Sequence, residues 1–139
     1  MPQTLCVDAN LVIAVLHPYE YLPAADAAWK QWSADAATII APPLFFAETT
    51  SVLRNHVYRG RLTAREGESL FAAAHALNVT AVSPPDLHQR AWELAKRYNL
   101  PRAYDAQYLA VATTLGCELW TADGRLANAV PEPWVRLVR

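Results

Sequence analysis

The sequence has no long apolar segment, no excess of charge of either sign and only two cysteines. Its longest apolar run without proline, Leu11 to Leu16, is far shorter than the ~20 residues of a membrane-spanning helix. The first residues lack the basic start and apolar stretch of a signal peptide. We therefore expect a cytoplasmic protein with no membrane association. The formal net charge of -1 does not indicate nucleic-acid binding by bulk charge, but a local basic patch is compatible with it.

Metal sites built on cysteine and histidine are disfavoured as well. Cys6 and Cys117 lie in apolar surroundings, which is typical of buried free thiols in a reducing compartment. The sequence contains no Cys-x-x-Cys pair and no Cys/His zinc spacing. Its four histidines show neither metal-ligand nor catalytic-triad spacing, and we interpret them as structural.

Length and pattern predict a single α/β domain over residues 1–139. A composition of 53% hydrophobic and 18% charged residues is typical of a compact globular chain, and no repeat or linker interrupts it. Short apolar runs alternate with helical patterns, which favours a mostly parallel sheet covered by helices. Strands are expected at residues 5–7, 38–41, 78–82, 118–121 and 134–138, and helices at 11–16, 24–33, 43–58, 64–76, 83–98, 103–115 and shortly after 124.

Four acidic residues lie inside apolar segments: Asp8, Glu48, Asp105 and Asp123. An ionised carboxylate is rarely buried without a partner, because its desolvation is very unfavourable. A shared function explains all four most simply, namely that the fold brings them together around a divalent cation. The sequence therefore predicts a metal-dependent enzyme.

Each acid also has a structural interpretation. Asp8 can cap the helix that follows it, and Asp123 before a glycine is a common turn residue. Glu48 can reach solvent from the edge of an apolar stripe, and Asp105 lies in a first helical turn, where the helix dipole favours a carboxylate.

The positions of two acids support the functional interpretation. Asp8 ends the first expected strand and Asp123 follows the fourth. In parallel sheets, functional groups gather beyond the carboxyl ends of the strands. Arg102 and Arg125 are the nearest residues that could pair with any of the acids, and these two are too few to neutralise four carboxylates.

Four segments in order, VDANLVIAVL, AETTSVL, YDAQYLAVA and LWTADGRL, make the chain resemble the PIN-domain family. The chain is most similar to the VapC-type ribonuclease toxins of toxin–antitoxin pairs, and the resemblance covers essentially its whole length. It implies a three-layer, Rossmann-like fold with a central parallel sheet of about five strands. It also implies a Mg²⁺- or Mn²⁺-dependent endoribonuclease that hydrolyses RNA through a metal-activated water, forms a homodimer and binds a cognate antitoxin protein.

The same resemblance assigns the site residues. Asp8, Glu48, Asp105 and Asp123 would be catalytic. Mg²⁺ binds one or two carboxylates directly and keeps several waters, so we expect Asp8 and either Asp105 or Asp123 to touch the metal. A supporting role is implied for three polar residues: Asn10, Thr121 and Asn128.

A basic cluster offers a route to RNA. Arg54, Arg59 and Arg61 lie around a glycine turn and could bind phosphates. The alternatives are a solvated corner between two helices, or a contact with the antitoxin or with a second copy.

Two other metal-dependent folds fit the sequence less well. A haloacid-dehalogenase-type phosphatase needs an Asp-x-Asp pair after the first strand, and Asn10 occupies the second position here. A receiver domain needs a late strand-end lysine, which the sequence lacks. A noncatalytic PIN-like module that binds RNA or protein remains the alternative.

Overall fold

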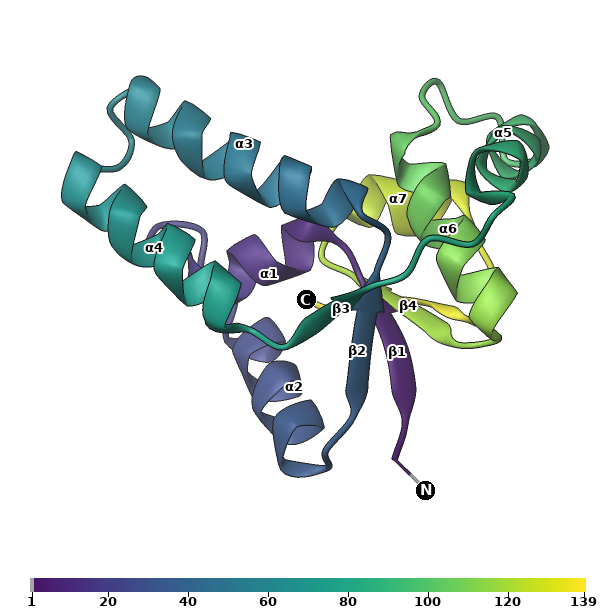
Figure 1. Ribbon diagram of the computed structural model, residues 1–139, viewed down its shortest axis with the longest axis horizontal. Helices are drawn as coiled ribbons and strands as arrows, with labels where there is room; N and C mark the ends of the chain where they lie inside the picture. The colour runs from purple at the N-terminus through teal and green to yellow at the C-terminus, as the bar shows by residue number, and fades with distance from the viewer. Residues whose placement is uncertain (1) are drawn as a thin grey trace.

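The computed structural model describes residues 2–139, and the chain alternates between strands and helices throughout that range (Figure 1). Its elements in chain order are β1 (Thr4–Val7), α1 (Ala9–Leu16), α2 (Pro23–Ala34), β2 (Thr38–Ala41), α3 (Leu44–Tyr58), α4 (Ala64–Ala76), β3 (Val79–Ala81), α5 (Leu87–Arg97), α6 (Tyr104–Leu115), β4 (Glu118–Thr121), α7 (Gly124–Ala129) and β5 (Val135–Leu137). None of the helices in this range is long and apolar enough to cross a membrane.

The five strands form one parallel sheet in the order β3-β2-β1-β4-β5. β1 is the central strand, and its Leu5 pairs with Ile39 of β2 on one side and Glu118 of β4 on the other. The chain moves outward from β1 through β2 to β3, and then crosses to β4 and continues to β5. The direction therefore reverses between β1 and β4, which is where a doubly wound sheet forms a crevice at its carboxyl edge.

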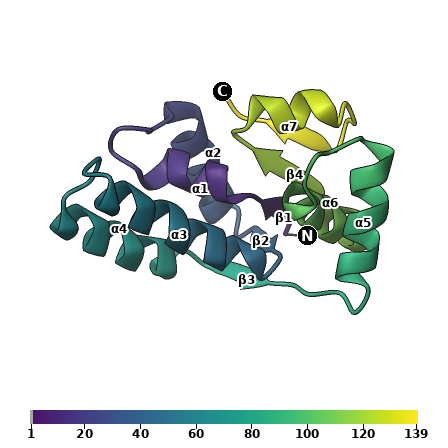
Figure 2. The ribbon, with the colours of Figure 1, turned by 90° about the horizontal axis from the view of Figure 1, so that it is seen from above.

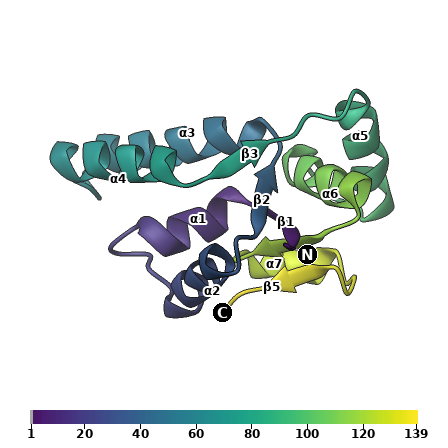
Figure 3. The same cartoon turned by 60° about the horizontal axis from the view of Figure 1, so that its bottom comes forward.

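Helices cover both faces of the sheet, as the fold prediction requires. α1 to α4 lie on one side of the sheet and α5 to α7 on the other (Figures 1 and 2). The α3–α4 hairpin extends away from the sheet, with α1 packed beside it (Figure 3). The prediction of a central parallel sheet of about five strands flanked by helices is confirmed.

The core lies between β1, β4 and α6. Leu5, Cys6 and Val7 of β1 are fully buried, and so is the middle of α6 from Leu109 to Ala112. A strand that is covered on both faces needs a continuous apolar sequence, which β1 has. α6 is apolar nearly all round because it packs against the sheet on one side and α5 on the other.

Local signals in the sequence set several helix ends. Thr63 and Glu66 form the expected capping box at the start of α4, with both hydrogen bonds present. Gly116 ends α6 with a φ of 64°, a left-handed conformation that glycine adopts without strain. The largest difference is at α5, which begins at Leu87 rather than near residue 83, because residues that precede proline avoid the helical conformation.

Candidate active site

Asp8 occupies the crevice at the carboxyl end of β1. It is the N-cap of α1, where its Oδ1 accepts a hydrogen bond from the Leu11 amide at 2.9 Å. Its Oδ2 accepts a hydrogen bond from the hydroxyl of Thr121, the last residue of β4. Asp8 is only 3% exposed. The hydrogen bonds from Leu11 and Thr121 hold both of its carboxylate oxygens in place. The capping interpretation is thus correct, and it leaves room for a second role.

Thr121 joins Asp8 to Asp123. Its hydroxyl donates to Asp8 and accepts from the Asp123 amide at 2.9 Å. Asp123 in turn caps α7, because its Oδ1 accepts from the Arg125 amide at 2.9 Å. The buried Thr121 therefore links the two strand-end acids across the switch point of the sheet.

The two helix acids approach the same edge of the sheet. Glu48 lies in the second turn of α3 and Asp105 in the first turn of α6, and both are partly buried. The hydroxyl of Tyr108 donates a hydrogen bond of 2.6 Å to Oε1 of Glu48. Tyr108 is 1% exposed, so it fixes one oxygen of Glu48 and leaves the other unoccupied by this contact.

Burial and mutual repulsion raise the pKa of three of these carboxyl groups. Burial raises the pKa of Asp8 from 3.8 to about 7, and the charges of Asp105 and Asp123 add to the rise while the hydrogen bonds from Thr121 and Leu11 oppose it. Burial also raises the pKa of Asp105, helped by Asp123. The charges of Asp105 and Asp123 thus act on Asp8, and that of Asp123 acts on Asp105, so these acids form one electrostatic cluster.

Glu48 belongs to the same cluster. Burial raises its pKa, the hydrogen bond from Tyr108 opposes the rise, and the charge of Asp105 adds to it. The structure therefore brings Asp8, Glu48, Asp105 and Asp123 together through a chain of neighbouring charges.

Basic side chains do not neutralise this cluster. Asp8, Glu48 and Asp105 make no ion pair with any residue that the structure describes. Arg125 lies 3.9 Å from Asp123, but its side chain is 97% exposed, and an exposed pair contributes little stability. Arg102 and Arg125 lower the pKa of Asp105 without cancelling the effect of burial.

Two cavities open beside the cluster. One, of about 370 Å³, is lined by Asp105, Asp123, Arg102 and Arg125, together with apolar residues. The other, of about 500 Å³, is lined by Asn10, Asp123 and Arg125 and by the loop between α1 and α2. Asp123 and Arg125 line both cavities, so the two cavities meet at Asp123.

The donor set fits a hard cation. The four acids supply carboxylate oxygens, which Mg²⁺ and Mn²⁺ prefer, rather than thiolates or imidazoles. Among the described residues only His17, Glu20 and His56 lie close enough to share one ion directly, so these acids would hold a cation partly through waters. A divalent ion would also relieve the repulsion between carboxylates, which Arg102 and Arg125 reduce only in part. Asp8, Asp105 and Asp123 are the residues that could hold it.

Two of the predicted supporting residues lie apart from these contacts. Asn10 is exposed and lines the larger cavity. Asn128 is exposed on α7 and is not among the residues that line either cavity. Their supporting roles stay predictions, whereas the contact of Thr121 with Asp8 is observed.

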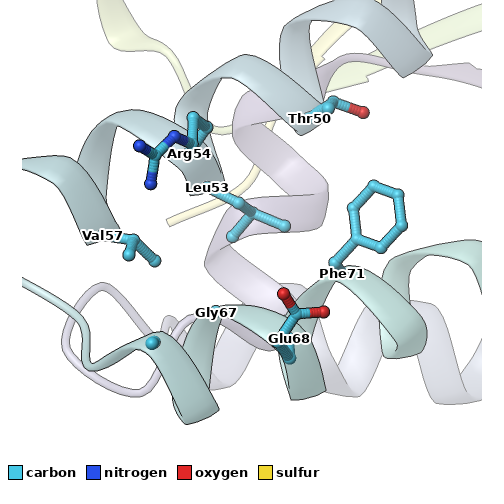
Figure 4. A pocket seen from close by; sticks show the side chains of 8 residues that line it. Thr50, Leu53, Arg54, Val57, Gly67, Glu68 and Phe71 are labelled. Atoms are coloured by element: carbon cyan, nitrogen blue, oxygen red, sulfur yellow. The ribbon is translucent and has the colours of Figure 1, made fainter.

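The predicted RNA-binding arginines lie at the far end of α3. Arg59 is eleven residues beyond Glu48, which is about 16 Å along a helix. Arg54 lines a groove between α3 and α4, where it neighbours Glu68 and Phe71 (Figure 4). These arginines are therefore separated from the carboxylates, and contact with RNA there stays a prediction.

The structure pairs two histidines that the sequence did not connect. Nε2 of His17 lies 2.7 Å from Nδ1 of His56, and Glu20 lies 3.9 Å from the far side of His56. These three residues have the spacing of a metal site. However, Nδ1 of His17 accepts a hydrogen bond from the Tyr19 amide at 3.1 Å, so Nε2 carries the proton. A metal-binding histidine normally donates through its second nitrogen, so we interpret the pair as a structural link between α1 and α3.

Tyr108 is the functional residue that sequence reasoning missed. It packs on the buried face of α6, three residues after Asp105, and its hydroxyl also donates a hydrogen bond to Glu48. The available signal was a tyrosine on the buried face of a helix, because a buried tyrosine hydroxyl needs a partner.

Comparisons with known proteins agree with this geometry. The family model described as the PIN domain matches residues 5–130, a range that includes all four acids. Ribonuclease VapC9 of Mycobacterium tuberculosis is 40% identical over 93 residues, which are 67% of this chain and 71% of that protein.

Solved structures share the fold at lower identity. The Mycobacterium tuberculosis VapC20 structure, described as a sarcin-ricin loop cleaving toxin, has a TM-score of 0.66 at 18% identity and covers 97% of this chain and 99% of its own. A toxin–antitoxin complex from Klebsiella pneumoniae has a TM-score of 0.65 at 18% identity, with 96% and 99% covered. The resemblance seen in the sequence is thus confirmed: the chain belongs to the PIN-domain family and is a relative of the VapC ribonucleases.

Proposed function

We propose that this protein is a Mg²⁺- or Mn²⁺-dependent endoribonuclease and the toxin of a type II toxin–antitoxin pair. The observation that carries the proposal is the convergence of four carboxylates, without basic partners that neutralise them, at the switch point of the sheet. The family match over residues 5–130 and the relatives named as ribonucleases support it.

In this proposal Asp8, Asp105 and Asp123 hold the metal. When bound, the cation supplies a Lewis acid that stabilises negative charge on a phosphate and acidifies a water. Thr121 keeps Asp8 oriented, because its hydroxyl donates to Oδ2 while the Leu11 amide holds Oδ1. Asn10, which lines the larger cavity, and Asn128 have supporting roles in this proposal.

Glu48 acts as the proton acceptor. Tyr108 occupies its Oε1, so Oε2 is the oxygen that receives a proton from the attacking water. Burial raises the pKa of Glu48, which makes it a stronger base than an exposed glutamate. The new bond would form between the water oxygen and phosphorus, the bond from phosphorus to one bridging oxygen would break, and that oxygen would leave as a hydroxyl after taking a proton from solvent.

The partners follow from the same family. An antitoxin protein is proposed because a structural neighbour is a toxin–antitoxin complex, and RNA because the relatives are named ribonucleases. A homodimer and RNA contacts by Arg54, Arg59 and Arg61 are further parts of the proposal.

The direct test is cleavage of a mixed pool of single-stranded RNA. The wild-type protein should cut it with Mg²⁺ or Mn²⁺ and not with EDTA, and Asp8→Asn should lower the rate by at least about a thousandfold. Asp35→Asn, at the exposed end of α2, is the matched control and should cut normally. RNA that stays intact with the wild-type protein and either metal would favour the noncatalytic module.

Tyr108→Phe should reduce cleavage while preserving the fold. The variant frees Oε1 of Glu48, and loss of a group that orients a catalytic ligand typically costs about 10- to 100-fold. The measurement is the single-turnover rate, compared with Tyr58→Phe on an exposed tyrosine. A rate equal to that of the wild type would show that Tyr108 only packs.

A further inference from the structure

We propose that the larger cavity is a nucleobase subsite that selects guanine next to the cleaved bond, with Tyr21 as the stacking surface and Glu20 as the reader of the base edge. The proposal rests on the proposed ribonuclease function and adds a preference for one base, which the four acids alone do not explain.

The cavity is placed for a neighbouring nucleotide. It has a volume of about 500 Å³, within the range of small-ligand sites, and it reaches Asp123 and Arg125. The smaller cavity shares these two residues. An RNA strand that occupies both would therefore pass its backbone near Asp123 and put one nucleotide in each cavity. Arg125, almost fully exposed between them, can contact the phosphate that joins the two nucleotides.

Tyr21 is an exposed aromatic ring that is held in place. It is 48% exposed and lines the cavity. Its hydroxyl donates to Oδ2 of Asp26 at 2.9 Å, and Lys30 binds the same oxygen at 2.8 Å. The ring is thus anchored at its hydroxyl while much of its surface stays open. Such a ring can stack on a base with little loss of conformational freedom.

Glu20 has carboxylate oxygens that are open to hydrogen bonds from a ligand. It is exposed, lines the same cavity, and its carboxylate accepts no hydrogen bond from the residues that the structure describes. Its nearest basic group is His56, at 3.9 Å. A carboxylate on an RNA-binding surface repels phosphates, so its position beside an anchored aromatic needs a donor-rich base edge as its partner.

Guanine provides that edge. Its Watson–Crick side carries two adjacent N–H donors, which match the two oxygens of a carboxylate. Adenine and cytosine place an acceptor beside their amino group, and uracil flanks its single N–H with two carbonyl groups. Glu20 therefore favours guanine over the other three bases.

Binding of free nucleotides tests the subsite without requiring activity. In NMR titrations of the wild-type protein, guanosine 5′-monophosphate should shift the resonances of Tyr21 and Glu20. It should also bind about tenfold more tightly than the adenosine, cytidine and uridine monophosphates. Glu20→Gln should remove this difference, and Tyr21→Ala should weaken binding of guanosine monophosphate by at least about fivefold. Glu68→Gln and Tyr58→Ala, on exposed residues of α4 and α3, should bind as the wild type does.

Cleavage of a random RNA library tests the same subsite in the reaction. Sequenced cut sites should be enriched in guanine on one side of the cleaved bond, and Glu20→Gln should lower that enrichment about tenfold while the library is still cut. Equal affinity for all four monophosphates, or enrichment that survives Glu20→Gln, would overturn the subsite. A wild-type protein that binds guanosine monophosphate at Tyr21 but cuts no RNA would instead overturn the proposed function.

Discussion

Asp8→Asn should make the metal-free protein more stable as well as inactive. The folded state raises the pKa of Asp8 from 3.8 to about 7, so the folded protein binds this proton more tightly than the unfolded chain does. The free energy of unfolding therefore falls as the pH rises from about 4 to about 7, by up to about 4 kcal/mol for this shift. Asparagine carries no charge, so the free energy of unfolding of the variant does not fall in this way as the pH rises.

Denaturant unfolding in EDTA at two pH values measures the effect. At pH 8 the variant should exceed the wild type by a few kcal/mol, and near pH 3 the two should agree, because Asp8 is then mostly protonated in both states. Asp35→Asn should match the wild type at both pH values. A variant that is less stable than the wild type at pH 8 would mean that the buried charge of Asp8 does not destabilise the metal-free fold.

Mg²⁺ or Mn²⁺ should stabilise the wild-type fold strongly. A ligand that binds only the folded state adds about 2.7 kcal/mol at one hundred times its dissociation constant. For a chain of 139 residues, that corresponds to a rise in Tm of roughly 5 to 10 °C. Differential scanning fluorimetry with increasing metal would record it.

The same metal titration on Asp8→Asn and Asp123→Asn shows whether the metal binds at these carboxylates. Both variants remove a proposed ligand, so each should lose most of the metal-dependent rise. His56→Gln is the informative control, because it removes the other group of residues with metal-ligand spacing. If only His56→Gln lost the effect, the metal would bind between α1 and α3 instead of at the sheet edge.

Most of the fold could be predicted from local signals. The runs at residues 38–41 and 118–121 became β2 and β4 with the expected bounds, because β-branched or apolar runs between turn signals leave little alternative. The capping box of Thr63 fixed the start of α4 in the same way. The order of the strands does not follow from these signals, since pairing of β1 with β4 joins residues more than a hundred positions apart.

The same distinction between local signals and long-range contacts applies to the site. The four acids were visible because a carboxylate in an apolar segment contradicts its surroundings. Thr121 could be inferred because it is two residues from Asp123. The contacts of Tyr108 with Glu48 and of His17 with His56 could not, because they join separate helices and depend on how α1, α3 and α6 pack. The loop that carries Tyr21 reaches the acids for the same reason.

The central claim is that Asp8, Glu48, Asp105 and Asp123 form one cation site. Anomalous diffraction from crystals of the wild-type protein soaked in Mn²⁺ tests it directly, since manganese gives a signal that water and magnesium do not. The account predicts a peak in contact with Asp8 and with Asp105 or Asp123. Crystals with full Mn²⁺ occupancy elsewhere and no peak at these carboxylates would contradict it.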